Sequence, residues 1–229
     1  DRAGKVVAFS GRILPVTEGI PEGIVPSETG KYINSPETPV FKKSDALFGL
    51  QIARPMMRQK AEAILVEGNF DVVSMHAKGF AETVAPLGTA FTESQAKLLR
   101  RSAETVTILF DADEAGRKAM RAAQGPCARV GLTARVVVLS KDVAKDPDEL
   151  LRREGGVEYL REKLAGAVDL IEWIIEDAAA HAGDTTQERV AAFKAIAPVV
   201  SEVRDRLQRE SYVDRARMRF HLDPKELRR

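Results

Sequence analysis

Apolar residues in the middle of the chain fall into short unbroken runs, and segments of helical period separate these runs. The runs lie at residues 63–66, 83–85, 105–110 and 135–139. Unbroken apolar runs of this length suit strands that are covered on both faces. The helical segments lie at residues 71–78, 92–101, 114–130 and 146–153. Strands that alternate with helices predict an α/β fold around a mostly parallel sheet.

Residues that cap, start or break helices refine these expectations. Thr92 is followed three residues later by Gln95, which is the spacing of a helix-capping box. Pro147 stands where a helix tolerates proline, in the first turn. Gly125 and Pro126 lie inside a helical segment and are expected to interrupt or kink it.

The region before residue 61 shows weaker patterns. Residues 5–14 alternate loosely and predict a strand or hairpin. Residues 15–30 are rich in proline and glycine and predict a loop. The polar stretch 31–38 has neither helical nor strand period, so its plain interpretation is a surface loop.

After Gly155 and Gly156 no strand signal recurs. Helical spacing is found at residues 157–164, 168–181, 186–203 and 204–219. These segments predict a helical bundle packed after the sheet. The expected organisation is an N-terminal α+β segment (1–60), a sheet domain (61–155) and a C-terminal helical bundle (156–229).

Composition narrows the class of protein. Apolar residues are 44% of the 229 residues, enough for a buried core, and no apolar run approaches the ~20 residues of a membrane span. The N-terminus lacks the pattern of a secretory signal, so a cytoplasmic protein is expected. The single cysteine, Cys127, excludes a disulfide or a cysteine-based zinc site within these residues. Thirty-five basic and 34 acidic residues nearly cancel, so net charge gives no guide.

Acidic residues follow three of the predicted strands. They are Glu67, then Asp111 and Asp113, then Asp146 and Asp148. Because ligands of parallel sheets bind at the carboxyl ends of the strands, we expect these five carboxylates to meet at one edge. Like charges repel unless cations lie among them, and Mg²⁺ or Mn²⁺ suits oxygen ligands. Taken singly, each acid is also consistent with a turn or a helix cap; together they predict metal-dependent phosphoryl or nucleotidyl transfer.

Several motifs resemble a known family. Residues 64–68 with 71–73, and residues 110–116, resemble the TOPRIM signature of primases, topoisomerases and some nucleases. Residues 31–38 resemble the basic motif that precedes TOPRIM in bacterial replicative DNA primases of the DnaG type, and residues 87–90 and 145–150 are similar to that family as well. The resemblance runs from about Gly4 to Gly155 and continues more weakly through the helical segments.

The resemblance implies roles for particular residues. Glu67, Asp111, Asp113, Asp146 and Asp148 match the acidic metal-site positions, with Glu67, Asp111 and Asp113 as catalytic residues. Arg12, Lys31, Asn34 and Lys43 match a basic face that handles template, primer or nucleotide. Surface solubility is an equal explanation for Lys43. Arg117 and Lys118 open the helix after Asp113 and are expected either to meet a nucleotide phosphate or to lie on a solvated face.

The sequence departs from the family pattern in two places. Asn69 and Phe70 replace the tyrosine and methionine often found after the Glu-Gly pair, and residues 15–30 form a longer insertion than usual. The resemblance also implies parts that these residues lack. Zinc is expected only in an absent N-terminal domain, and contact with the replicative helicase only through an absent C-terminal domain.

The implied function is that of a DNA primase core, a nucleotidyltransferase and DNA-directed RNA polymerase of the primosome. It would use Mg²⁺ or Mn²⁺ to make RNA primers from NTPs on single-stranded DNA during replication, as a monomeric fragment without membrane contact. Two alternatives remain. A type IA topoisomerase or TOPRIM nuclease would share the acids, although Tyr32, Tyr159 and Tyr212 lack the context of a catalytic tyrosine. A degenerate TOPRIM module would only bind nucleic acid or a partner, and would gain nothing from five clustered acids.

Overall fold

A five-stranded sheet forms the centre of the computed structural model, which describes residues 4–12, 32–111, 113–140 and 142–222. Its strand order is β4-β3-β5-β6-β7. The strands are β3 (Glu62–Val66), β4 (Thr83–Val84), β5 (Thr105–Leu109), β6 (Thr133–Val136) and β7 (Val168–Asp169). All neighbours pair in parallel except β7, which runs antiparallel to β6. The predicted mostly parallel α/β sheet is confirmed.

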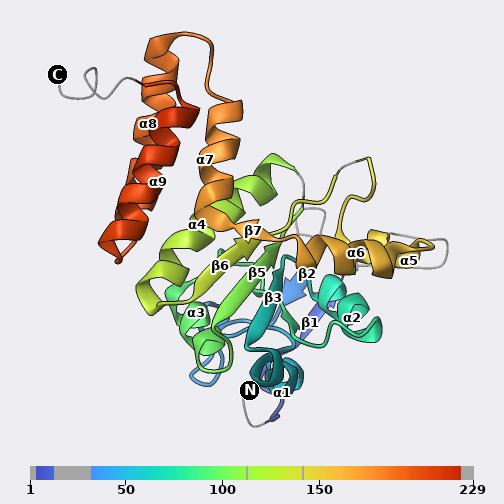
Figure 1. Ribbon diagram of the computed structural model, residues 1–229. Helices are drawn as coiled ribbons and strands as arrows, with labels where there is room; N and C mark the ends of the chain where they lie inside the picture. The colour runs from blue at the N-terminus through green and yellow to red at the C-terminus, as the bar shows by residue number, and fades with distance from the viewer. Residues whose placement is uncertain (1–3, 13–31, 112, 141, 223–229) are drawn as a thin grey trace, which may run out of the picture.

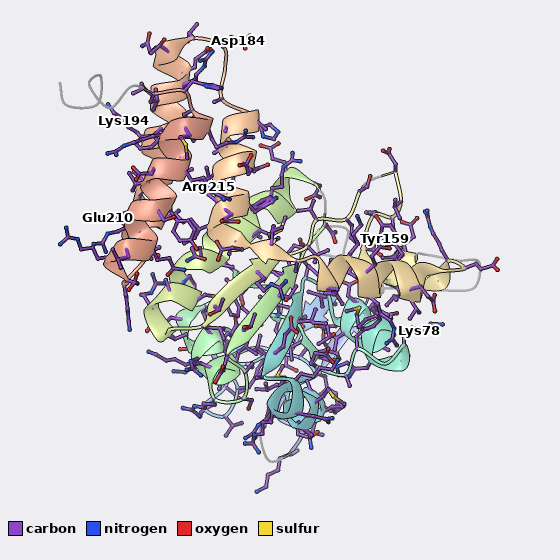
Figure 2. All side chains as sticks on the ribbon, in the orientation of Figure 1. Lys78, Tyr159, Asp184, Lys194, Glu210 and Arg215 are labelled. Carbon is purple, nitrogen blue, oxygen red and sulfur yellow. The ribbon has the colours of Figure 1, made fainter. Side chains whose placement is uncertain are left out.

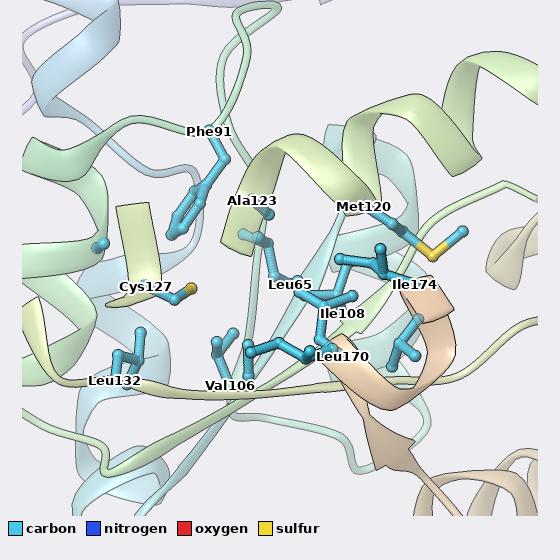
Figure 3. Packing of buried hydrophobic residues seen from close by; sticks show 14 of the residues in the cluster. Leu65, Phe91, Val106, Ile108, Met120, Ala123, Cys127, Leu132, Leu170 and Ile174 are labelled. Atoms are coloured by element: carbon cyan, nitrogen blue, oxygen red, sulfur yellow. The ribbon is translucent and has the colours of Figure 1, made fainter. Parts of the chain in front are cut away.

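Helices cover both faces of the sheet (Figure 1). They are α1 (Leu50–Lys60), α2 (Asn69–Ala77), α3 (Glu93–Arg100), α4 (Glu114–Val130), α5 (Pro147–Arg152) and α6 (Gly156–Ala165). Successive residues of a strand point to opposite faces. Ala63 and Leu65 therefore join the core beneath α1, α3 and α4, while Ile64 and Val66 join the core beneath α2, α5 and α6. Figure 3 shows the first of these cores, where Leu65 and Ile108 lie close to Met120 of α4.

Two further strands, β1 (Ser10–Arg12) and β2 (Tyr32–Asn34), form a separate antiparallel ribbon. Among the described residues, neither strand pairs with a strand of the large sheet. Ser10 pairs with Asn34, and Arg12 with Tyr32. The strand expected within residues 5–14 is thus present. Part of the stretch read as a plain surface loop is a strand instead, because its backbone finds a hydrogen-bonding partner in β1.

The C-terminal helices form the predicted bundle. They are α7 (Leu170–Ala180), α8 (Thr186–Ser201) and α9 (Arg206–Arg219), and they stand together beside α4 in Figure 1. Arg215, on the side of α9 nearest α7 in Figure 2, pairs with Glu172 at 2.9 Å. Arg121 of α4 pairs with the buried side chain of Asp177 in α7, which joins the bundle to the sheet domain.

Several local predictions were wrong. Helix α4 is not interrupted at Gly125 and Pro126, because Pro126 and its neighbour Cys127 are buried and this packing offsets the missing backbone hydrogen bond; a kink there stays a prediction. Strand β6 begins at Thr133 rather than at residue 135. Strand β7 lies beyond residue 155, where no strand was expected, and its two residues are too few to give a pattern.

Helix α1 was not predicted, since Pro55 stands within it. Helix α6 packs with α5 against the sheet, through Leu160, rather than with the later helices. No helix within the described ranges is long and apolar enough to cross a membrane.

The strand order creates a topological switch point between β3 and β5. From β3 the chain crosses to β4 on one side, and it then returns to form β5 on the other side. Connections that leave two neighbouring strands in opposite directions open a crevice at their carboxyl ends. Here those ends are Val66 and Leu109, which are partners in the register. The residues that follow them, Glu67 and Asp111, therefore lie where a ligand site is expected.

Candidate acidic active site

Glu67 and Asp111 are in direct contact at the switch point. Oε1 of Glu67 accepts a hydrogen bond of 3.0 Å from the backbone N–H of Asp111. Partial burial raises the pKa of Glu67, the hydrogen bond from Asp111 lowers it, and the charge of Asp113 raises it further. The predicted meeting of these two strand ends is therefore found in the structure.

Asp113 and Gly116 shape the first turn of α4 against this contact. Oδ1 of Asp113 caps the helix by accepting a hydrogen bond of 2.7 Å from the N–H of Gly116. A Cβ at Gly116 would stand 2.1 Å from the carbonyl oxygen of Asp111 and 2.9 Å from Oε1 of Glu67. Only glycine allows this approach, so Gly116 sets how closely α4 meets the acidic turns.

Asp146 and Asp148 reach the same region from the N-terminus of α5. Oδ1 of Asp146 caps the helix with a hydrogen bond of 2.8 Å from the N–H of Glu149. The carboxylate of Asp148 accepts hydrogen bonds from the hydroxyl of Ser74 and from Arg152, whose nitrogens lie 2.6 and 3.3 Å away. Both aspartates thus have the structural role of cap or ion pair in addition to any role toward a ligand.

Asp71 is an acid of the site that sequence reasoning did not assign. It is 7% exposed, and its carboxylate accepts hydrogen bonds from the N–H of Gly68 at 3.0 Å and the N–H of Asp148 at 3.3 Å. Asp71 therefore joins the turn after β3 to the start of α5. Its position in the first turn of a helix that directly follows Glu67 was the available signal.

Like charges converge on Asp111. Partial burial, followed by the charges of Glu67, Asp71, Asp146 and Asp113, raises the pKa of Asp111 to about 7. Burial, followed by the charge of Asp146, raises the pKa of Asp71 to about 6, although the two backbone hydrogen bonds lower it. Acids that raise one another's pKa are close enough to repel, so these carboxylates, which come from distant parts of the chain, lie near one another at this edge.

The donor chemistry of this cluster fits a divalent cation, since every side chain offers carboxylate oxygens and the mutual repulsion would be relieved by positive charge. The described carboxylates are not yet grouped as the ligands of a bound metal ion would be. Across the described ranges, no three His, Cys, Asp or Glu side chains are grouped so that they could hold one ion. Asp113 and Asp146 are engaged as caps, and Asp148 is bound to Arg152, so binding requires these side chains to turn.

The basic candidates are placed less uniformly. Arg117 lies in the first turn of α4, close in the chain to Asp113, and Lys118 beside it is exposed. Nδ2 of Asn34 donates to the carbonyl of Leu87 at 3.4 Å, and its buried Oδ1 has no partner within the described protein.

Lys43 lies in a single helical turn, η1 (Lys43–Asp45). The backbone carbonyl of Lys43 accepts a hydrogen bond from the side-chain amide of Gln95. In the described part of the chain, no hydrogen bond or ion pair joins Lys43 to the acids. Lys31 falls outside the described residues. Of Arg12, the structure describes the backbone within β1.

Comparison with known families agrees with this fold and site. The family model described as "Toprim-like" matches residues 64–151, which contain most of the parallel strands, the switch point and the acidic turns. The chain therefore carries a TOPRIM-type α/β domain. A second model, "DNA primase catalytic core, N-terminal domain", matches residues 1–54, and a third, "DnaB-helicase binding domain of primase", matches residues 171–224.

Individual relatives are primases. The DNA primase of Aquifex aeolicus is 39% identical over 188 residues, which are 82% of this chain and 35% of the relative. A DNA primase domain from Pseudomonas aeruginosa superposes with a TM-score of 0.80 at 31% identity, covering 98% of this chain and 67% of that one. A structure described as the DnaG primase catalytic domain bound to ssDNA covers 99% of this chain and 68% of that one, with a TM-score of 0.79 at 28% identity.

The chain belongs to the bacterial DnaG-type DNA primase family. It spans about a quarter to a third of the length of the curated relatives it matches. The match of residues 171–224 corrects one expectation, namely that any helicase-binding part would lie outside these residues.

Proposed function

We propose that this chain carries the catalytic core for RNA primer synthesis on single-stranded DNA. The observation that carries the proposal is the convergence of three acidic turns, headed by Glu67, Asp111 and Asp146, at the switch point of a TOPRIM-type sheet. The solved primase domain bound to single-stranded DNA, to which this chain is similar over nearly its whole length, supports such a template.

Primer synthesis joins the 3′-hydroxyl of a growing strand to the α-phosphorus of an incoming nucleoside triphosphate, and pyrophosphate leaves. Glu67, Asp111, Asp113, Asp146 and Asp148 would hold Mg²⁺ or Mn²⁺. When bound, such a cation offsets phosphate charge and favours the ionised hydroxyl. Asp71 positions two of the acidic turns relative to each other, through its bonds to the N–H groups of Gly68 and Asp148.

Cationic side chains complete the proposed site. Arg117 and Lys118 stand where α4 leaves the acidic edge, so they are suited to the triphosphate of the incoming nucleotide. Arg12, Lys31, Asn34 and Lys43 would follow the backbone of template or primer. Contacts of this kind neutralise phosphates and carry no sequence information.

The test is a primer-synthesis assay with single-stranded template, the four NTPs and Mg²⁺ or Mn²⁺. Short RNA that is lost in Glu67→Ala and Asp111→Ala would support the proposal, and Glu62→Gln, at the opposite end of β3, is the control that should keep activity. Cleavage or relaxation of DNA in place of RNA synthesis would favour a topoisomerase or nuclease. Binding of DNA with no chemistry in the wild-type protein would favour a degenerate module.

We further propose that α7–α9 contact the replicative helicase, on the support of the family match over these residues. A groove of about 640 Å³ between α8 and α9 offers the surface, with Phe193, Ile196 and Val213 among its apolar lining. Its charged lining is balanced, because Glu210 and Asp214 stand beside Arg209 and Arg217. Helix α9 carries five arginines against one glutamate and one aspartate. An amphipathic helicase helix that lays its apolar face on Phe193, Ile196 and Val213 fits this groove.

Ala197 lines the groove and is exposed, so Ala197→Glu adds a charge there with little effect on folding. We expect it to weaken helicase binding at least about tenfold, because it places a carboxylate against the apolar face of the partner. Ala195→Glu is the matched control, since Ala195 is exposed on the same helix outside the groove. Equal binding by both variants in a pull-down with the purified helicase would reject the groove.

A further inference from the structure

Two side-chain amides connect the β1–β2 ribbon to the sheet domain. Nδ2 of Asn69 donates to the hydroxyl oxygen of Ser10 at 2.8 Å, and Nδ2 of Asn34 donates to the carbonyl of Leu87 at 3.4 Å. Ser10 and Asn34 are partners across the ribbon, so both connections act at the same rung. The bond from Asn69 is the shorter of the two.

The two ends of the Asn69–Ser10 bond lie beside the two halves of the proposed site. Asn69 is the first residue of α2 and follows Glu67 by two positions. Ser10 precedes Arg12 by two positions on β1, and it lies opposite Asn34. The ribbon behaves as one unit, because the N–H groups of Ser35 and Phe9 make reciprocal hydrogen bonds of 2.9 Å across it, to the carbonyl of Phe9 and the hydroxyl of Ser35.

Apolar packing does little to fix the ribbon in this place. Val6 and Phe9, just before β1, are 75% and 78% exposed. Residues 5–10 line one part of a cavity of about 750 Å³, and Val72, Val73 and His76 of α2 line another part. With so little apolar contact, a directional polar bond has more influence on the distance between β1 and α2.

We propose that Asn69 is a positioning residue that holds β1, through Ser10, at a set distance from Glu67. For its catalytic consequence this inference rests on the proposed function: the bond would fix the distance between β1 and the acidic edge, so that phosphates of a nucleotide or template could contact both. Asn69 replaces the tyrosine often found in the family, and its amide fits the Ser10 hydroxyl here. The bond positions β1 before the reaction begins. Its loss is therefore expected to change substrate binding more than the turnover rate.

The direct test measures the distance between the two parts. Gly11, at which a Cβ would meet nothing within 4 Å, and Ala115, exposed in α4, are replaced with cysteine and spin-labelled. The native Cys127 stays unlabelled, because burial raises its pKa to about 12. We expect a narrow distance distribution in the parent, and a broader or shifted one after Asn69→Ala or Ser10→Ala.

Ala77→Ser is the matched control, since Ala77 is exposed at the other end of the same helix, lies outside the cavity, and its change leaves the bond intact. Ser10→Thr keeps a hydroxyl and should restore the narrow distribution. An unchanged distribution in both Asn69→Ala and Ser10→Ala would overturn the proposal, whichever of the two variants folds better. This readout needs no activity, so a loss of the proposed function and a loss of this inference can be told apart.

Kinetics supply the second readout. In primer synthesis, Asn69→Ala is expected to raise the KM for NTP about fivefold, the scale of one hydrogen bond, while kcat changes less than about twofold. Ser10→Ala should have the same effect, and the double variant should add nothing, because both remove one bond. Additive effects, or a fall in kcat with KM unchanged, would contradict the positioning role.

Discussion

The two ends of the central sheet carry the same type of side chain in opposite settings. At the amino ends, Glu62 accepts a hydrogen bond of 2.6 Å from Thr107, and the buried Glu82 forms an ion pair of 2.5 Å with Lys60. At the carboxyl ends, Asp111 faces the charges of several other carboxylates, and its pKa rises to about 7. Acids with partners hold a fold together, whereas acids left to repel one another mark a place prepared for a cation.

The largest expected effect comes from disturbing the acidic end without removing an acid. Gly116→Ala places a methyl group against the carbonyl of Asp111, so the turns must move apart. A displacement of about 1 Å is expected to lower primer synthesis about 100-fold. Ala115→Ser, on the exposed neighbour, should leave activity within about twofold. Normal activity of Gly116→Ala would show that the geometry of these turns is unimportant.

The corresponding change at the amino end should affect stability alone. Lys60→Met removes the cation from Glu82, whose side chain is 4% exposed, and leaves a buried charge. We expect a loss of about 3 kcal/mol in the free energy of unfolding, measured by urea denaturation, with cation binding unchanged. Lys78→Met, at an exposed lysine (Figure 2), is the control and should be neutral.

The pH dependence of stability separates the two ends further. Asp111 has an ordinary pKa of 3.8 and a folded-state pKa of about 7, so between about pH 4 and pH 7 the folded protein binds more protons than the unfolded chain. Stability contributed by the protonated group is therefore lost as pH rises through this window.

Without divalent cations, Asp111→Asn should flatten the fall in Tm across that range. Added Mg²⁺ should raise the Tm of the parent more at pH 8 than at pH 5, because protons compete for the same oxygens. A parent and variant with the same pH profile would contradict the repulsion inferred at this edge.

The smallest expected effect concerns Arg152. It pairs with Asp148 four residues earlier in α5 and is 73% exposed, so the pair is weak. Arg152→Ala should free the carboxylate and tighten cation binding about twofold by calorimetry. Arg153→Ala, which breaks the equivalent pair with Glu149, should change nothing. Weaker cation binding in Arg152→Ala would mean that the arginine orients Asp148 instead of competing for it.

Much of this architecture could be predicted because its signals are local. The apolar runs of β3 and β5 and the Thr92–Gln95 capping box are visible in a few adjacent residues, and the fold rule for parallel sheets then brings Glu67 and Asp111 together. Strand β7 could not be predicted, since two residues carry no period. The same is true of helix α1, which forms despite Pro55.

The candidate site, too, could be predicted only in part from the sequence. Acids that directly follow strands were recognisable, but Asp71 acts through the N–H groups of Gly68 and of the distant Asp148, a relation that only folding creates. The bond between Asn69 and Ser10 joins residues 59 positions apart, and it likewise has no local signature. Contacts between elements, rather than the elements themselves, could not be predicted from the sequence.

The most direct test of the cation site is anomalous X-ray scattering from crystals soaked in Mn²⁺. The account predicts Mn²⁺ density among Glu67, Asp111, Asp113, Asp146 and Asp148, with the side chain of Asp148 turned away from Arg152. Crystals of Asp111→Asn should show much weaker density. Mn²⁺ that binds elsewhere, or an acidic edge without density in fully soaked parent crystals, would contradict the central claim.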